Sequence, residues 1–201
     1  MRIAIWADDE SWILLGLSEN ENRIRVKNNL VFPDNNINGF IQLVPFMEDQ
    51  YIPDAGNKPY FINDVGLLSA KLNHPSIIPF NGWKGFIEKE YWEMAGKLSD
   101  GAMEVLSLIH RKALVVPQTP GMVSPKVISM IINEAWFALD EKVSSKEEID
   151  TAMKLGTNYP LGPFEWADQI GIKNIYYLLK ELEKTDPLYT PAPLLIKAAL
   201  S

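Results

Sequence analysis

The stretch "DTAMKLGTNYPLGPFEWADQIG", residues 150–171, decides the fold of the C-terminal part of this 201-residue chain. Gly156 and Gly171 stand where helical segments would end, because glycine adopts the positive φ of a helix C-terminus without steric cost. Pro160 and Pro163 bracket a short turn, and the second proline suits the first turn of a new helix. The stretch therefore predicts short helices joined by a rigid turn.

Helical patterns continue on both sides of this stretch. Ser145, with Glu148 three residues later, has the pattern of a capping box before the helix that Gly156 would end. Further helices are expected at 172–184 and 190–200. Residues 125–142 place one apolar stripe on a long helix, formed by Val127, Met130, Ile131, Ala135 and Leu139. Residues 119–201 are thus expected to form an all-helical unit.

Residues 1–118 show a different pattern, in which short apolar runs alternate with loops and helical segments. A helix follows the first run, with Asp8 or Asp9 as its cap, and helical spacing recurs at 65–73 and through 90–111. Strands that alternate with helices indicate a parallel α/β sheet. The strand candidates are residues 2–7, 40–46, 60–64, 76–83 and 113–118. The predicted fold is a short Rossmann-like α/β domain at 1–118 followed by a helical domain at 119–201.

Composition narrows the classes of function. The chain is 47% hydrophobic and 22% charged, with a net charge of −7, so its surface is expected to repel nucleic acid and anionic lipid. It has no cysteine, which excludes disulfides and thiolate sites and fits a reducing compartment. No apolar run suits a signal peptide or a membrane span. A cytoplasmic protein is expected.

Four ordered motifs resemble the C-terminal helical domain of the 3-hydroxyacyl-CoA dehydrogenase family. They are "QTPGMV" (118–123), "EEIDTAMKLG" (147–156), "YPLGPFEWADQIG" (159–171) and "PAPLL" (191–195). The resemblance covers residues 113–201. It implies a preceding Rossmann domain that binds NAD, a substrate of the 3-hydroxyacyl-CoA class, and a homodimer formed through the helical domain. The stripe on 125–142, with Tyr176 and Tyr177, would suit such an interface.

The expected cofactor loop departs from the family pattern. Family members carry G-x-G-x-x-G, where the backbone approaches the NAD pyrophosphate at a helix N-terminus. The corresponding stretch here, "AIWADDESWILL", contains no glycine and places Asp8, Asp9 and Glu10 near the phosphate positions. Like charges about 4 Å apart cost about 4 kcal/mol at a surface-type dielectric. NAD binding in the family manner is not expected, and Asp34 is only a nominal ribose partner.

The catalytic motif of the family is altered as well. The resemblance places Asn81 at the position of the catalytic histidine, and Glu93, twelve residues later, at that of its orienting glutamate. An amide has no titratable nitrogen and cannot take up the substrate proton. Asn63 keeps a family asparagine near the nicotinamide, whereas Lys84 replaces another asparagine. The other altered positions are Val65 for a serine, Pro125 for an asparagine and Lys126 for an arginine.

No other catalytic arrangement emerges from the sequence. His74 precedes a strand, and His110 stands at a helix end, where a histidine usually caps or interacts with the helix dipole. No cluster has metal-ligand spacing. A separate possibility is a ligand in the crevice at the carboxyl ends of the strands. The residues that would meet there are Trp6, Asn63, Asn81, Trp83 and Glu93.

Two functions remain. The first is a non-catalytic relative without NAD, in which the helical domain serves as a dimeric acyl-CoA-related binding or structural module. The alternative is a divergent, active NAD-dependent 3-hydroxyacyl-CoA dehydrogenase of fatty-acid metabolism in which Glu93 acts directly or through water. Replacement of the cofactor loop and of the histidine favours the first.

Overall fold

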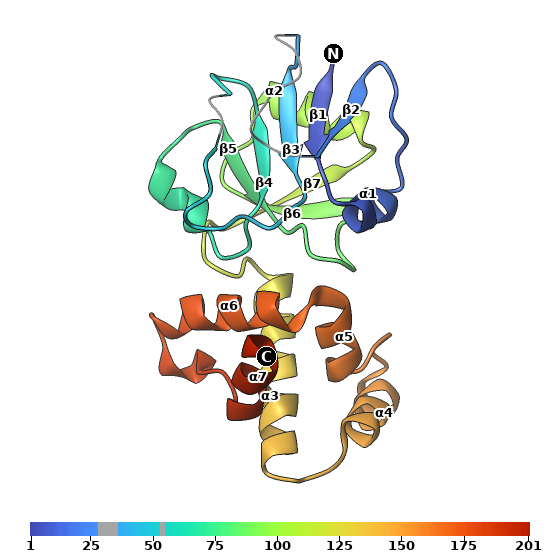
Figure 1. Ribbon diagram of the computed structural model, residues 1–201, viewed down its shortest axis with the longest axis vertical. Helices are drawn as coiled ribbons and strands as arrows, with labels where there is room; N and C mark the ends of the chain where they lie inside the picture. Colours follow the sequence, from blue (N-terminus) through green and yellow to red (C-terminus); the bar gives the residue numbers. More distant parts are fainter. Residues whose placement is uncertain (28–35, 53–54) are drawn as a thin grey trace. The chain divides into compact units, whose positions relative to one another are not determined.

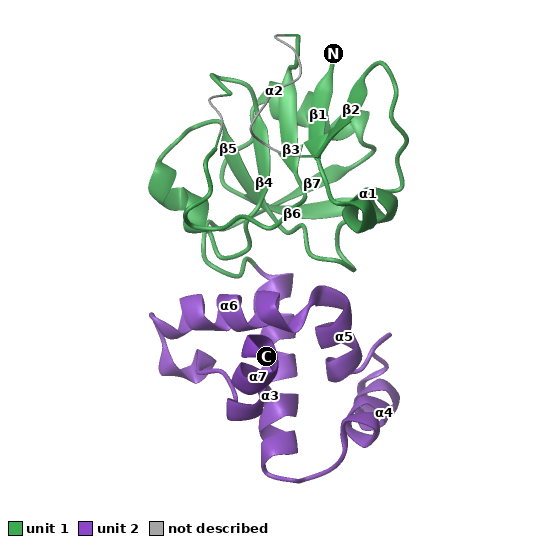
Figure 2. Cartoon of the chain, in the orientation of Figure 1, with its two compact units in different colours: residues 1–122 green, residues 123–201 purple. Residues whose placement is uncertain are grey.

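The computed structural model describes residues 1–27, 36–52 and 55–201. The chain divides into two compact units, Met1–Met122 and Val123–Ser201, which are green and purple in Figure 2. The division falls after Met122, whereas the sequence predicts it after residue 118.

Within the described residues, the first unit is built on a seven-stranded sheet of order β2-β1-β3-β4-β5-β6-β7 (Figure 1). Pairing is parallel from β2 to β5, β6 is antiparallel to β5, and β7 is parallel to β6. The predicted parallel α/β sheet is confirmed, with a reversed pair of strands at one edge. The strands are β1 (Ile3–Trp6), β2 (Arg23–Val26), β3 (Gly39–Gln42), β4 (Tyr60–Asn63), β5 (Ile77–Phe80), β6 (Tyr91–Ala95) and β7 (Lys112–Val116).

The two faces of the sheet are covered differently. On one face, side chains such as Ile5, Ile41 and Phe61 pack against the helix α2 (Asp100–Leu108) and around Leu15 of α1 (Asp9–Leu15). The opposite face presents Ala4, Phe40 and Tyr60, which pack with Ile37 and Ala55 from connecting segments. In the described parts of the β3–β4 and β4–β5 connections, the only helical element is the 3-10 helix η1 (Leu68–Leu72). This second face is therefore covered mainly by loops.

The helical prediction for residues 90–111 is wrong in its first half. Tyr91–Ala95 is strand β6, and the helix begins only at Asp100, where the Ser99 side chain accepts a hydrogen bond from the Ala102 N–H. The reason is tertiary: Trp92 stacks on Phe80 of β5 with ring centroids 4.6 Å apart. An aromatic run that packs on a neighbouring strand outweighs an accidental helical spacing.

The second unit is helical, as predicted. Ser145 and Glu148 form the expected capping box at the start of α4. Gly156, predicted to end that helix, lies inside it; α4 ends at Thr157, and Asn158 takes the left-handed conformation (φ +57°). The elements are α3 (Ser124–Asp140), α4 (Lys146–Thr157), α5 (Pro163–Ile170), α6 (Ile172–Glu183), η2 (Pro187–Tyr189) and α7 (Pro193–Leu200).

Asp150 explains the spacing of the stretch at 150–171. From α4, its buried carboxylate accepts hydrogen bonds from the backbone N–H groups of Phe164 (2.8 Å) and Glu165 (3.2 Å) at the start of α5. A Cβ atom on Gly162 would lie 2.2 Å from Asp150 Oδ1. The glycine before Pro163 is therefore required for the close approach of the two helices, and the carboxylate caps α5 in trans.

The long helix α3 buries a different face from the predicted stripe. Ser129, Ile132, Asn133 and Trp136 are buried, and Asn133 bonds to the Thr190 carbonyl and the Ala192 N–H, each at 2.9 Å. Of the predicted stripe, only Ala135 is buried, while the Val127 side chain is 54% exposed. Met130, Ile131 and Leu139 are partly buried, so Val127 is the one member of the predicted stripe that is exposed in this unit.

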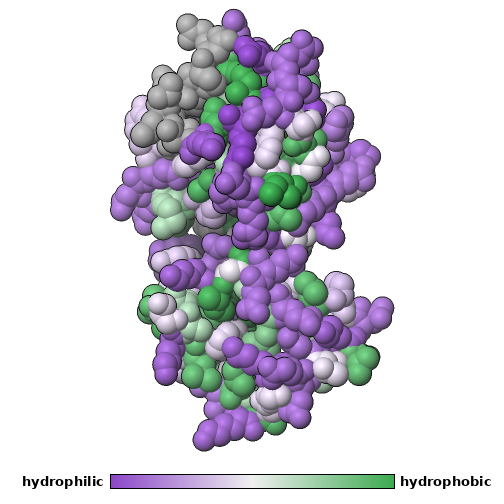
Figure 3. Space-filling model, turned by 45° about the vertical axis from the view of Figure 1, so that its right-hand side comes forward, coloured by the Kyte–Doolittle hydropathy of each residue, from purple (hydrophilic) through white to green (hydrophobic). Residues whose placement is uncertain are grey.

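In the space-filling view of Figure 3, hydrophilic residues cover much of the visible face and hydrophobic residues are scattered among them. Across the described residues, no helix combines the length and the apolar character that a membrane crossing needs.

Candidate functional site

The carboxyl ends of the parallel strands are where an open α/β sheet places its ligands, at the point where the strand order reverses. Here the reversal lies at β1, which has β2 on one side and β3 on the other. The side chains that follow β1, β3, β4 and β5 therefore define the candidate site.

The turn after β1 is closed by hydrogen bonds and an ion pair that involve its own aspartates and Arg25 of β2. Asp8 caps α1 by accepting a hydrogen bond from the Ser11 N–H at 2.6 Å. Asp9 forms an ion pair with Arg25 of β2 at 2.5 Å. The same guanidinium donates to the Ala7 carbonyl at 3.2 and 3.3 Å. This hydrogen bonding to Arg25 lowers the pKa of Asp9.

Glu10 also has a partner, because Lys84 from the β5–β6 connection forms an ion pair with it. From the sequence alone, Asp8, Asp9 and Glu10 count as charges that would repel a diphosphate. Asp8 caps α1, as the sequence predicts, whereas Asp9 and Glu10 are each paired with a cation that the sequence does not indicate.

The β1–α1 turn lacks the features with which a glycine-rich loop receives the diphosphate of a dinucleotide. The position needs bare backbone amides and a close backbone approach. Instead, the Ser11 N–H is already bonded to Asp8, and Arg25 lies on the Ala7 carbonyl. No glycine is present between Ala4 and Leu15. Asp34, the nominal ribose partner, lies outside the described residues.

Asn63 joins the ends of three neighbouring strands. Its Nδ2 donates to the carbonyls of Leu43 (2.8 Å) and Gly82 (3.1 Å), and its Oδ1 accepts from the Gly82 N–H (3.0 Å). A Cβ atom on Gly82 would lie 2.5 Å from Asn63 Cγ. The predicted cofactor-binding amide is thus used to hold the loops after β3 and β5.

The structure brings Asn81 and Glu93 together. The register pairs Phe80 with Met94 across the antiparallel β5–β6 edge, which puts Asn81 opposite Glu93, on the same face of the sheet. The Asn81 N–H donates to the Glu93 carbonyl at 2.9 Å. Both residues are buried, with 1% and 7% of their surface exposed. The amide oxygen of Asn81 accepts from the Trp83 N–H at 3.2 Å.

The other candidates from the sequence are two tryptophans and the two histidines. Trp83 is buried next to Asn81, and the Trp6 indole donates to the Lys27 carbonyl at 3.2 Å. His74 is exposed and precedes β5, whereas Asn81 follows β5, so the two lie at opposite ends of that strand. His110 is exposed after α2 and has φ +55°. Neither histidine replaces the missing base beside Glu93.

Sequence reasoning missed a buried carboxyl group at this edge. Asp64, directly after β4, is 3% exposed and accepts from the N–H groups of Leu68 (3.0 Å) and Ser69 (2.6 Å). Burial raises its pKa, against the opposing effect of these hydrogen bonds. In the sequence, the available signal was the position of this aspartate between a predicted strand and a predicted helical segment, where an aspartate often caps the helix. Among the described residues, no group of three or more potential ligands suits a metal ion.

Comparison with known proteins identifies the second unit. A family model described as "3-hydroxyacyl-CoA dehydrogenase, C-terminal domain" matches residues 121–200. The 3-hydroxyadipyl-CoA dehydrogenase of Escherichia coli K12 is 42% identical over 92 residues, which are 45% of this chain and 19% of that protein. The 3-hydroxybutyryl-CoA dehydrogenase of Clostridioides difficile is 39% identical over 100 residues, which are 49% of this chain and 36% of that protein.

Solved structures agree with these matches. The 3-hydroxybutyryl-CoA dehydrogenase of E. coli K12 superposes with a TM-score of 0.61 at 32% identity, covering 70% of this chain and 31% of that one. The (S)-3-hydroxybutyryl-CoA dehydrogenase PaaH1 of Ralstonia eutropha has a TM-score of 0.64 at 21% identity. The superposition covers 88% of this chain and 69% of that one. The latter likeness shows the fold alone, a Rossmann-like unit followed by a helical unit.

The matched segment spans 19% and 36% of the two curated relatives' own length. The match nevertheless contains three of the four motifs quoted from the sequence and the end of the first, and it includes Asp150, Gly162 and Pro163. Residues 121–200 thus match the C-terminal domain of the 3-hydroxyacyl-CoA dehydrogenase family, and the chain is similar to members of that family over this segment.

Proposed function

We propose that this chain is a 3-hydroxyacyl-CoA dehydrogenase relative that lacks the NAD-dependent reaction and acts as a dimeric, acyl-CoA-related binding or structural module. The observation that carries the proposal is the pair Asn81 and Glu93. A general base must accept a proton from the substrate hydroxyl, and an amide beside the retained carboxylate has no nitrogen that accepts one.

The β1–α1 turn supports the same conclusion independently. A diphosphate there would have to displace Arg25 from Ala7 and Asp9, and to separate Lys84 from Glu10. Each displaced group would lose an existing charge-assisted contact. The expectation is therefore that the chain binds NAD or NADH poorly.

The surface of the helical unit supports the proposed role as a dimeric binding or structural module. Its apolar α3 stripe is only partly buried within the unit, and Val127 of the stripe and Tyr177 of α6 are each 54% exposed. Large apolar side chains exposed in this way are candidates for an interaction surface. The names of the relatives specify acyl-CoA thioesters, which makes an acyl-CoA the ligand class to test. The cysteine-free composition fits the reducing cytoplasm, where we place the module.

A divergent active dehydrogenase is the second candidate. It is favoured by one observation, the buried Glu93 kept opposite the position of the missing base. In that reading the Glu93 carboxylate would take the proton directly or through a water molecule.

The deciding experiment titrates the full chain with NADH by fluorescence and then follows NADH oxidation with acetoacetyl-CoA. The E. coli 3-hydroxybutyryl-CoA dehydrogenase is the positive control. We expect neither saturable NADH binding nor turnover. Turnover that disappears in Glu93→Gln would establish the divergent enzyme and refute the proposal. Calorimetry with acetoacetyl-CoA alone tests the ligand class, and saturable binding without NADH is the expected result.

A further inference from the structure

The loop-covered face of the sheet contains two adjoining pockets that the family resemblance does not account for. In α/β proteins, helices normally cover both faces of a parallel sheet. Here the described parts of the β3–β4 and β4–β5 connections cover the second face with loops and η1. They leave cavities of about 480 Å³ and about 320 Å³. Small-molecule pockets fall in this size range.

The larger pocket has aromatic and aliphatic walls. Tyr60 and Ile77, which pair in register on β4 and β5, line it, and Leu72 and Tyr51 line it from the connecting segments. The Tyr60 hydroxyl already donates to Gln42 Oε1 at 3.1 Å. What the pocket offers is therefore mainly ring and aliphatic surface, which suits a planar apolar group.

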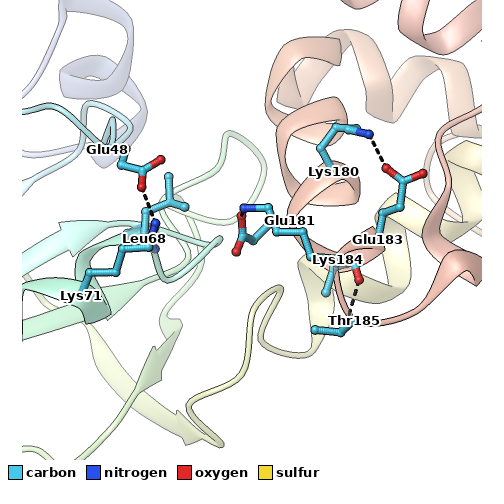
Figure 4. Close-up of polar contacts among 10 residues, drawn as sticks. Glu48, Leu68, Lys71, Lys180, Glu181, Glu183, Lys184 and Thr185 are labelled. Atoms are coloured by element: carbon cyan, nitrogen blue, oxygen red, sulfur yellow. Dashed lines mark hydrogen bonds and ion pairs between the residues drawn. The ribbon is translucent and has the colours of Figure 1, made fainter.

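The smaller pocket is polar and adjoins the larger one through His74 and Ile77, which line both. Its amide side chains are Asn73, from the end of η1, and Gln118, from the segment after β7. No lysine or arginine is among the described residues that line either pocket. The neighbouring cation, Lys71 of η1, forms an ion pair with Glu48 (Figure 4). An anionic ligand would therefore find no compensating side-chain cation in this groove.

His74 supplies a directional donor between the two pockets. Its Nδ1 accepts a hydrogen bond from the Ser76 N–H at 3.3 Å. A neutral imidazole that accepts at Nδ1 carries its proton at Nε2. The ring thus offers an N–H donor at the junction of an apolar and an amide-lined cavity.

From this arrangement we propose that the groove binds an uncharged aromatic molecule with an amide or hydroxyl substituent. The ring occupies the cavity of Tyr60, Leu72 and Ile77, and the polar substituent meets His74, Asn73 and Gln118. This site is separate from the strand ends that carry Asn81 and Glu93, so its occupation is independent of the proposed function above.

The test uses the full chain and two probes of the same shape, indole-3-acetamide and indole-3-acetate, followed by ligand-observed NMR titration. We expect the amide to bind saturably with a Kd of about 1 mM or tighter, the range for a ligand of this size. The acetate should bind at least about tenfold more weakly, because it brings a charge that the lining does not neutralise.

Three variants locate the binding. His74→Phe keeps a ring but removes the donor, and should weaken amide binding about tenfold. His110→Asn, which alters the other exposed histidine, should leave it unchanged. Leu72→Lys adds a cation at a half-exposed wall position and should shift the preference toward the acetate. The proposal is overturned if neither probe binds at about 5 mM, if the acetate binds more tightly to the unmodified chain, or if His74→Phe has no effect.

Discussion

At the scale of single residues, Asn63 and Gly82 show how closely the end of the sheet is packed. All three hydrogen bonds of the Asn63 amide go to backbone groups of Leu43 and Gly82. From the sequence, Asn63 stands out as a retained family asparagine and a candidate for cofactor binding, near the end of a predicted strand. The sequence cannot show that its partner is a glycine in the loop after another strand, because that contact depends on the packing of β4 beside β5.

Gly82→Ala tests this contact. The added Cβ would meet Asn63 Cγ at 2.5 Å, in a buried region where neither backbone can withdraw. We expect a loss of about 1–3 kcal/mol in the free energy of unfolding, as for other overpacked sites. Urea denaturation measures it. The matched control is Gly101→Ala in α2, where the nearest atom would be 3.7 Å away and where alanine should stabilise the helix by up to about 1 kcal/mol. Equal effects of the two substitutions would contradict the packing argument.

Asp64 makes a prediction about pH. Its pKa is raised by burial, so the folded chain holds the proton more tightly than the unfolded chain does. The resulting stability is fully present below the unfolded pKa of about 3.9, and it is lost as pH rises through the folded pKa. Asp64→Asn removes this titration. Relative to that variant, the unmodified chain should lose stability as the pH increases from about 4 to 7.

Urea unfolding at several pH values measures this difference. Glu104→Gln, at an exposed position on α2, is the control and should give a much smaller pH-dependent difference. A difference between the unmodified chain and Asp64→Asn that does not change with pH would show that Asp64 does not titrate as proposed.

At the scale of elements, Arg111 holds together segments that are distant in sequence. Its guanidinium donates to the carbonyl of Leu15 at the end of α1 (2.8 Å) and to that of Ile87 in the β5–β6 connection (3.2 Å). It also bonds to the Ile109 carbonyl after α2 (3.3 Å) and lies over the Trp92 ring. Burial lowers its pKa, which reflects the cost of removing the charge from water.

Arg111→Met keeps much of the aliphatic contact but leaves these carbonyls without their donor. Buried groups that lose a hydrogen-bond partner cost about 1–3 kcal/mol, and we expect a loss of that size in the free energy of unfolding. Chemical denaturation followed by tryptophan fluorescence is the measurement. Lys97→Met, at an exposed position after β6, should change the stability little. Equal losses of stability in Arg111→Met and Lys97→Met would contradict this role of Arg111.

Elements were predictable where local rules determine them. The caps at Asp8 and Ser145 and the helix start at Pro163 follow from short-range hydrogen bonding and backbone geometry. Strand β6 was not predictable, because its aromatic residues also fit a helical spacing and only Phe80 on β5 decides between the two. Gly156 was misjudged for a related reason: Asn158 also adopts positive φ, and the helix continues past the glycine.

At the scale of the whole molecule, the order of the motifs identified the helical unit, but the closure of the β1–α1 turn could not be predicted. Arg25 and Asp9 are 16 residues apart, and Lys84 and Glu10 are 74 residues apart. The sequence shows the three acidic residues of the turn and not the cations that neutralise them. The pairing of Asn81 with Glu93 was accessible, because the family spacing and a hairpin-like reversal place both at one edge.

The proposed dimer gives the last prediction. If the α3 face that carries Val127 forms the interface, a charge at Val127, which is 54% exposed, would be buried without a partner on association. Burying an unpaired charge costs several kcal/mol, and a twofold axis introduces it on both subunits. Val127→Glu should therefore convert a dimer to a monomer in light scattering coupled to size-exclusion chromatography, without loss of helical circular dichroism.

Leu155→Glu is the control for this experiment, because Leu155 is 83% exposed on α4 and outside the stripe. It should leave the dimer intact. α6 offers a second test of the surface: Tyr177→Glu should also weaken association, whereas Lys180, on the same helix, already pairs with Glu183 and should tolerate replacement by glutamine. A monomeric unmodified chain, or a dimer that survives both Val127→Glu and Tyr177→Glu, would remove association through α3 and α6 from the proposed function. The proposed loss of the dehydrogenase reaction would be unaffected, because it depends on the chemistry of Asn81 and Glu93 in the first unit.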